Sequence, residues 1–335
     1  MPGFGRSRPE VEDSGDVDFT PASMPYLVLG FLIGIPLVAY VTLSVVLYRR
    51  LFVPDRSGAF DDFMFTPWEF QADYEEVDLA TVDGVAFGAW FFRQTASPQV
   101  IVISPGHKAR RQDLLGIAVG LWRKGFNVLC YSYRGMPASD RMLITMGVHE
   151  VQELAEAIAF ARRHVRGAKI GLLGYSMGAV VSLLGAAGDP SVEALVLDSP
   201  YADLRQVVRE NVRRHALLPG SPFVTAIGLW MRLRHGVRLG DASPITVLSG
   251  LEPRPLFFIH GAADVTTAAH HSRRLYDAYR GPREIWIVQG APHTGGYFAD
   301  RSLYVERVAG FFARNLGLKT AGQLRLVGDE DEEVS

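Results

Sequence analysis

The stretch GYSMGAVVSLLGAAG, residues 174–188, determines how the rest of the chain is interpreted. It follows the apolar run IGLLG, which is typical of a buried strand, and it leads directly into a helical pattern. Ser176 stands at this junction between Gly174 and Gly178. A sharp turn from strand to helix strains the central residue, and glycine neighbours let the chain close around it. The pattern predicts an exposed nucleophilic serine, with the glycine-rich start of a buried helix as the plainer alternative.

Strand-like and helical patterns alternate on both sides of this junction. Two short β runs flank the turn-forming pair Asp83-Gly84 and predict an antiparallel hairpin. Buried-strand runs follow at QVIVIS, FNVLCYSY, AKIGLLGYS, VEALVLD, RPLFFIHG and REIWIVQG. Helices are expected near residues 112–124, 148–165, 268–280 and 301–315, and from residue 177. The alternation predicts an α/β fold with a mostly parallel central sheet flanked by helices.

The region 202–250 breaks this rhythm and is expected to form a helical cap insertion. It is interrupted by proline and glycine near residue 220 and is rich in arginine. The basic residues of the cap are Arg205, Arg209, Arg213, Arg214, Arg232, Arg234 and Arg238. Together with Lys108, Arg110 and Arg111, they predict either an ordinary solvated face or a surface that holds the domain on anionic lipid.

A serine hydroxyl needs a base to take its proton, and the chain offers nine histidines. His293 is the candidate, because the loop after the last expected strand would bring it to the sheet edge where Ser176 lies. The acid that orients it is expected at Asp264, after the preceding strand. Asp198, at the end of another strand, is the rival acid. The order Ser176, Asp264, His293 along the chain matches a known arrangement of such triads.

Acyl transfer also requires N–H donors for the developing oxyanion. Met177, directly after the candidate nucleophile, is expected to supply one of them. The other is expected from the loop SPGHKARRQD, where Gly106 lets a following amide turn inward, so His107 or Lys108 would donate it.

Several motifs in order resemble those of α/β-hydrolases: YEEVDLATVDGVAFGAW, YSYRG, GYSMG, LVLDSPYADLR, HGAADVTT and APHTGGY. The resemblance covers residues 66–315 and is to the branch with an N-terminal membrane anchor and peptidase- or acylesterase-like features. It implies the α/β-hydrolase fold, with Ser176 as nucleophile, His293 as base and Asp264 as acid. Two departures are Pro105-Gly106 in place of His-Gly and the absence of Val-Pro after the acid.

The expected activity is therefore that of a serine hydrolase, acting on an ester, thioester or amide through an acyl-enzyme without a cofactor. A carboxylesterase or lipase-like enzyme is favoured over a peptidase, because no β-propeller and no amine-binding acidic pair accompanies these motifs. The alternatives are a serine peptidase and a catalytically silent scaffold that binds a lipid or protein at the membrane.

Residues 26–48 carry no charged side chain and are expected to form a transmembrane anchor. At a rise of about 1.5 Å per residue they reach roughly 34 Å, against a hydrocarbon core of about 30 Å. An acidic segment precedes this long apolar run, unlike the basic region of a signal peptide. Arg49, Arg50 and Arg56 follow it and predict a single-pass protein with a cytoplasmic C-terminal domain.

The remaining boundaries follow from composition. Residues 1–25 are expected to form an acidic tail, 49–74 a juxtamembrane connector, 75–318 the hydrolase domain and 319–335 an acidic disordered tail. A formal net charge of −2 gives no indication of a nucleic-acid partner. The single cysteine, Cys130, excludes an intramolecular disulfide, and no Cys/His cluster has zinc-ligand spacing. The expected partners are an acyl substrate and the membrane, with no metal or other cofactor.

Overall fold

The computed structural model describes residues 28–53, 65–134, 144–216 and 219–318. The predicted tails, residues 1–25 and 319–335, lie outside the described residues. The chain divides into two compact units, residues 1–46 and 47–335.

The second unit is built on a mixed sheet that has eight strands within the described ranges, in the order β1-β2-β4-β3-β5-β6-β7-β8. The strands are β1 (Glu75–Ala80), β2 (Ala86–Phe92), β3 (Gln99–Ser104), β4 (Asn127–Tyr131), β5 (Lys169–Tyr175), β6 (Val192–Asp198), β7 (Leu256–Gly261) and β8 (Arg283–Val288). β1 and β2 form an antiparallel hairpin at one edge, and β2 pairs antiparallel with β4. All the other pairs are parallel. The mostly parallel α/β sheet predicted from the sequence is therefore confirmed.

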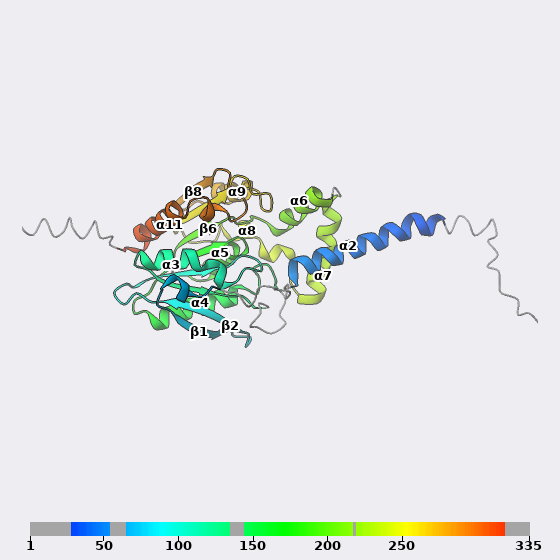
Figure 1. The fold of residues 1–335 in the computed structure, drawn as a ribbon. Coiled ribbons are helices and arrows are strands. Elements are labelled where there is room, and N and C mark those ends of the chain that lie inside the picture. Colours follow the sequence, from blue (N-terminus) through cyan, green and yellow to red (C-terminus); the bar gives the residue numbers. More distant parts are fainter. Residues whose placement is uncertain (1–27, 54–64, 135–143, 217–218, 319–335) are drawn as a thin grey trace, which may run out of the picture. The chain divides into compact units, whose positions relative to one another are not determined.

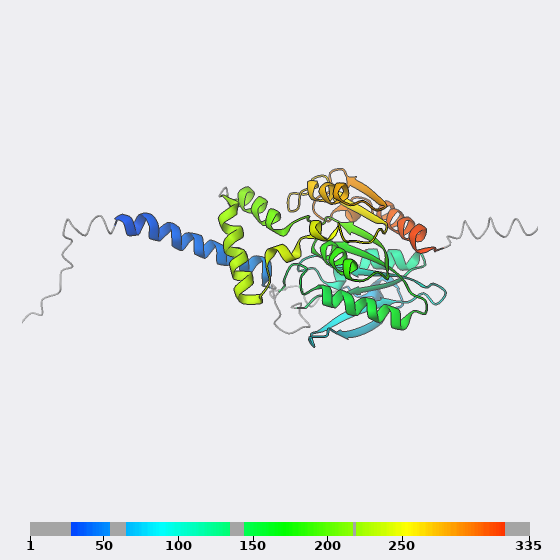
Figure 2. The same cartoon turned by 180° about the vertical axis from the view of Figure 1, so that it is seen from behind.

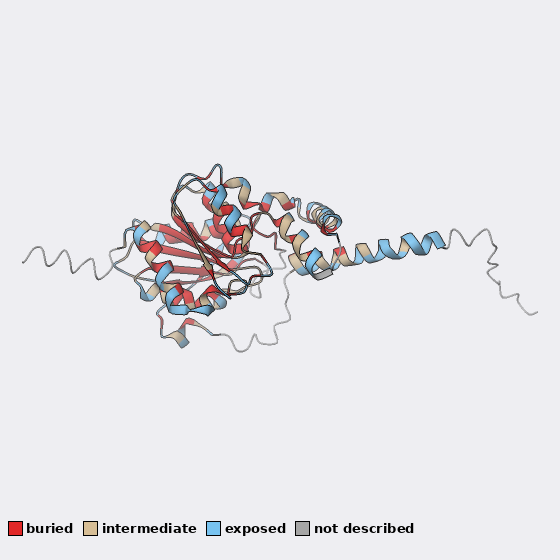
Figure 3. Ribbon diagram, turned by 90° about the horizontal axis from the view of Figure 1, so that it is seen from above, coloured by how far each residue is buried: buried red, intermediate tan, exposed pale blue. Residues whose placement is uncertain are grey.

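Helices cover the sheet because its central strands are apolar on both faces. Every residue of β3, β4 and β7 is buried, and Figure 3 shows these strands enclosed between helices whose outer faces are exposed. The covering helices are α3 (Leu115–Arg123), α4 (Val151–His164), α5 (Met177–Gly188), α9 (His270–Ala278) and α11 (Arg301–Leu316). α3 packs with α11, and α4 packs with α5. The carboxyl ends of the parallel strands share one edge, where the loops after β3, β5, β7 and β8 meet.

A helical cap follows β6. It consists of α6 (Leu204–Ala216), α7 (Gly220–His235), the short 3-10 helix η4 (Leu239–Ala242) and α8 (Pro244–Val247). α6 and α7 pack against each other and stand off the sheet in both views of the molecule (Figures 1 and 2). Shorter elements are η2 (Pro67–Phe70), η3 (Arg111–Leu114) and α10 (Gly296–Ala299).

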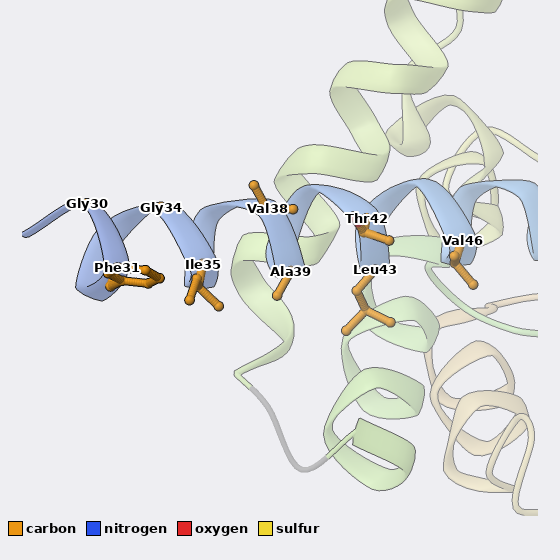
Figure 4. Close-up of a pocket in the computed structure, with 9 residues that line it drawn as sticks. All are labelled: Gly30, Phe31, Gly34, Ile35, Val38, Ala39, Thr42, Leu43 and Val46. Atoms are coloured by element: carbon orange, nitrogen blue, oxygen red, sulfur yellow. The ribbon is translucent and has the colours of Figure 1, made fainter. Parts of the chain in front are cut away.

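The first unit contains most of an apolar helix, whose last residues, 47–52, belong to the second unit. A π-helical turn, η1 (Gly30–Gly34), leads into α2 (Ile35–Phe52), and the helix continues through Pro36. The span Gly30–Phe52 has 23 residues and a mean hydropathy of 2.2, enough in length and composition to cross a bilayer. A signal sequence near the N-terminus would pass the same test. Figure 4 shows Phe31, Ile35 and Leu43 among the side chains that line a groove along this helix.

Candidate active site

Ser176 occupies the turn between β5 and α5. Its backbone has φ 51° and ψ −114°, a left-handed conformation that is strained for any residue except glycine. The Ser176 N–H donates a hydrogen bond to the carbonyl oxygen of Asp198 at 2.7 Å, which ties the turn to the end of β6. The hydroxyl therefore stands at the carboxyl edge of the sheet.

The two glycines beside Ser176 are required by close backbone approaches. A Cβ at Gly174 would collide with the backbone of Gly178 and Ala179, the first turn of α5. A Cβ at Gly178 would collide with the backbone carbonyls of Ser104 and Pro105. The glycines let α5 start immediately after the strand and bring the loop after β3 next to the serine.

His293 lies in the loop between β8 and α10 and reaches Ser176. Its Nε2 is 2.9 Å from Ser176 Oγ, and its Nδ1 is 2.6 Å from Asp264 Oδ2. Because the carboxylate accepts, Nδ1 carries the proton and Nε2 presents a lone pair to the serine hydroxyl. The loop is held against the end of β7, since the Ala263 N–H donates to the Ala291 carbonyl at 3.0 Å. The structure thus brings Ser176, His293 and Asp264 into one hydrogen-bonded chain.

Asp264, in the loop after β7, has both carboxylate oxygens fully engaged. Oδ1 accepts from the N–H groups of Thr266 at 2.8 Å and Thr267 at 2.9 Å. Oδ2 accepts from His293 and from His260 Nε2 at 3.1 Å. Burial would raise the pKa of Asp264, but the hydrogen bonds from His260 and His293 outweigh it and hold the pKa well below its usual range. The carboxylate stays ionised beside the His293 ring.

His260, in β7, is a contributor that the sequence does not single out. Its Nε2 donates to the Thr267 carbonyl at 2.6 Å, and its Nδ1 accepts from the Ser272 hydroxyl at 2.7 Å. These partners fix the proton on Nε2, where it also faces Asp264. His260 therefore helps to position the Asp264 carboxylate, since it contacts the same oxygen as His293. A buried histidine at the end of a strand gives no pattern from which this contact could be predicted.

The rival acid, Asp198, ends β6 beside Ser176, but its carboxylate has other partners. Its Oδ2 accepts from the Tyr304 hydroxyl at 2.7 Å and its Oδ1 from the Ser199 hydroxyl at 2.8 Å. Burial raises the pKa of Asp198 against the effect of these two hydrogen bonds. The side chain that hydrogen-bonds to the His293 ring is that of Asp264.

The predicted oxyanion donors flank the serine. Gly106 lies against Ser176, since a Cβ added to it would be 3.7 Å from the serine Cβ. Within the described part of the chain, the backbone N–H groups of Met177, His107 and Lys108 have no hydrogen-bond acceptor. Lys108 has a left-handed φ of 60°, which turns the loop sharply at this point. The three N–H groups are therefore not used in the hydrogen bonds of the described residues.

A cavity of about 720 Å³ opens at Ser176 and His293. Its volume is within the usual range of small-molecule sites, roughly 300–1,000 Å³. Its aliphatic walls come from the cap, from α3 and from the end of α2, and polar side chains such as Arg50 and Asp113 also line it. Representative lining residues are Leu204, Val208, Ile227, Ile117, Leu47 and Leu51. Such walls suit an apolar chain attached to the group that reacts at Ser176.

One further cluster has the composition of a metal site. The ligand atoms of Glu210, His270 and His271 lie within 4.8 Å of one another. The Ala202 N–H donates to His271 Nδ1 at 3.3 Å, so the proton of this ring is on Nε2, which faces Glu210 Oε2 at 3.2 Å. A cation at Nε2 would have to displace that proton. The geometry fits a hydrogen-bonded link between α6 and α9.

Comparisons with known proteins relate this chain to enzymes. A family model described as "Serine aminopeptidase, S33" matches residues 95–235. The uncharacterized protein YqkD of Bacillus subtilis is 30% identical over 191 residues, which are 56% of this chain and 62% of that protein. The match thus spans less than two thirds of that relative. The uncharacterized protein YfhR of Escherichia coli K12 is 23% identical over 75% of this chain and 84% of its own length.

Solved structures include an esterase of Pyrococcus furiosus, Pf2001, that superposes with a TM-score of 0.64. It shares 22% sequence identity and covers 79% of this chain and 98% of its own. At this identity the similarity establishes a shared fold.

Proposed function

We propose that this chain, which has the α/β-hydrolase fold, is a serine hydrolase that forms an acyl-enzyme on Ser176. The observation that carries the proposal is the chain of hydrogen bonds from Ser176 Oγ through His293 to Asp264, at 2.9 Å and 2.6 Å. A strained serine, a histidine with its lone pair directed at the hydroxyl, and an ionised carboxylate behind it form the arrangement needed for nucleophilic catalysis.

Each residue has a defined part in the proposed reaction. Ser176 Oγ attacks the carbonyl carbon while His293 Nε2 takes its proton, and the carbonyl oxygen becomes an oxyanion. The N–H of Met177 and an N–H of the loop after β3 stabilise that charge. The imidazolium, stabilised by Asp264, then protonates the leaving group as the bond to it breaks. Water repeats the sequence on the acyl-enzyme and releases the acid, which regenerates the serine.

The proposed substrates are carboxylic esters or thioesters of aliphatic acids. The aliphatic walls of the cavity beside Ser176 support this class. A serine peptidase is the second candidate, because the matching family model is described as an aminopeptidase. An aminopeptidase needs a carboxylate for the substrate's ammonium group, and the one carboxylate among the described lining residues is that of Asp113. Its Oδ2 already accepts from the Arg110 N–H at 2.8 Å, which favours the ester.

The proposal includes a single-pass membrane anchor with the catalytic unit in the cytoplasm. The apolar span Gly30–Phe52 and the arginines that follow the predicted anchor support this topology. The basic residues contribute unevenly to lipid binding. Arg205 pairs with Asp203 at 2.7 Å, and the Arg111 guanidinium lies 4.4 Å from the Trp90 ring. Arg232 and Arg234, in the last turn of α7, are better candidates to contact anionic lipid.

The test is hydrolysis of matched substrates by the full-length protein in detergent. A series of p-nitrophenyl esters, from acetate to palmitate, is compared with aminoacyl p-nitroanilides. Ester turnover that disappears in Ser176→Ala is the expected result. Turnover of the anilides alone would replace the esterase with the peptidase, and no turnover by folded wild type would favour a silent scaffold.

A further inference from the structure

We infer that the last turns of α2, residues 47–52, form one wall of the substrate cavity, and that Leu47 and Leu51 on this wall set the acyl chain length. The inference rests on the proposed acyl-transfer function. It assigns a role in substrate selection to residues that the sequence divides between the predicted anchor, 26–48, and the predicted connector, 49–74.

These residues are built into the hydrolase unit. The Phe52 side chain is fully buried, and its carbonyl oxygen accepts a hydrogen bond from the Ile144 N–H at 3.1 Å. Tyr48 is also buried, and its hydroxyl lies 2.6 Å from Nε2 of His235, at the end of α7. The rings of Tyr48 and Trp230 are 6.3 Å apart. The helix end is therefore fixed against the cap and the loop before α4.

The neighbouring face of this helix end lines the cavity of the reacting groups. Leu47 and Leu51 line the same cavity as Ser176 and His293. Their spacing of four residues places both side chains on one face of the helix, while Tyr48 and Phe52 occupy the next face. Another part of the wall comes from α6 and includes Leu204 and Val208. An acyl chain that enters this cavity would therefore contact both the α2 wall and the cap.

The same helix end borders the space beside the loop that carries the expected oxyanion donors. Leu51 and His107 both line the cavity. Burial lowers the pKa of His107 to about 4, so the ring is neutral near pH 7. The α2 wall and the loop next to Ser176 therefore enclose the same space with neutral side chains at Leu51 and His107.

Larger and smaller side chains on the wall test the inference in the full-length protein. Leu47→Trp and Leu51→Trp fill part of the cavity, whereas Leu47→Ala and Leu51→Ala enlarge it. The readout is the ratio of kcat/KM for the p-nitrophenyl decanoate ester to that for the acetate ester. We expect the ratio to fall by roughly tenfold or more in the tryptophan variants, since filling a pocket by a few methylenes discriminates by about that much. In the alanine variants the optimum should move to longer chains.

The matched control is Leu37→Trp, on the same helix but outside the cavity lining, at a position that is 56% exposed. It should keep the wild-type ratio. An unchanged ratio in the folded Leu47 and Leu51 variants of both sizes would overturn the inference, and so would an equal change in the control. Failure of the proposed function is a separate outcome, because wild type would then hydrolyse neither ester.

Discussion

At the level of single residues, Asp264 determines which ring nitrogen of His293 carries the proton. The carboxylate accepts from the His293 Nδ1–H, which leaves Nε2 free to accept from Ser176. Two backbone N–H groups and His260 hold the carboxylate in place. The role of Asp264 in this account is electrostatic and orientational, so the position must keep both its geometry and its charge.

The first prediction separates the two acids. Asp264→Asn should lower kcat for ester hydrolysis by about 10⁴-fold, because an amide stabilises the wrong tautomer of the histidine. Asp198→Asn should cost less than about tenfold, since Asp198 hydrogen-bonds to Tyr304 and Ser199. Steady-state kinetics of the two folded variants measure this. A larger loss for Asp198→Asn would assign the acid to that residue instead.

The second prediction concerns acid stability through His107. Its pKa is about 4 in the folded protein, against 6.5 for an ordinary histidine. Between these values the unfolded chain binds a proton that the folded chain does not, so stability decreases as the pH falls from 6.5 towards 4. His107→Gln cannot titrate and should lose less stability over this window than wild type. Melting temperatures in detergent across this pH range measure the difference, and parallel curves would refute the prediction.

The sequence placed Ser176, Asp264 and His293 at one sheet edge because each follows a parallel strand. The sequence contains no pattern that identifies His260 as a partner of Asp264 or Leu51 as a lining residue of the cavity. Their contacts depend on how β7 and α2 pack against segments that are distant along the chain. For the same reason Asp198 remained a rival, since the end of β6 reaches the same edge and only the hydrogen-bond partners distinguish the two acids.

At the level of elements, the turn from β5 to α5 depends on how closely three backbone segments approach. Gly178 lies against the carbonyls of Ser104 and Pro105, so α5 and the loop after β3 are in direct contact. The periodicity of the sequence could predict the strand and the helix. The tight turn explains why glycines occur there. The sequence does not show that Gly178 lies against the loop after β3, which is the contact that excludes a larger side chain.

The third prediction uses two glycines of α5. Gly178→Ala should lower kcat/KM by about 100-fold or more, because a displacement of the loop by about 1 Å can cost this much. Gly188→Ala, at the end of the same helix, is the control, since a Cβ there meets nothing within 4 Å. That variant should keep its activity and unfold at the same or a slightly higher temperature. Equal activities of the two variants would show that the close approach is unimportant.

The position at which α2 ends cannot be predicted from hydropathy alone. The uncharged run ends at Tyr48, yet the helix continues through Arg49 and Arg50 to Phe52. What fixes its last turn is burial of Phe52 and the hydrogen bond from Ile144, which no local pattern encodes. The last turns of this helix thus carry two arginines and also line the cavity, and Arg50 is itself one of the lining residues.

At the level of the whole molecule, the proposed anchor is distinguished from a cleaved signal by the fate of residues 26–48. The fourth prediction is that the protein stays in the membrane fraction after washing with alkaline carbonate, with these residues still present by intact mass. Burial of an apolar span of 23 residues makes extraction by salt or high pH unfavourable. Release into the supernatant, or a shortened N-terminus, would contradict the anchor.

The central claim is that Ser176 is an activated nucleophile, and reaction with a fluorophosphonate tests it most directly. The full-length protein in detergent is treated with the probe, and the adduct is located by mass spectrometry of peptides. The account predicts one adduct on Ser176 in wild type, none in Ser176→Ala, and much slower labelling in His293→Ala. Folded wild type that remains unlabelled, or equal labelling of Ser176→Ala, would contradict it.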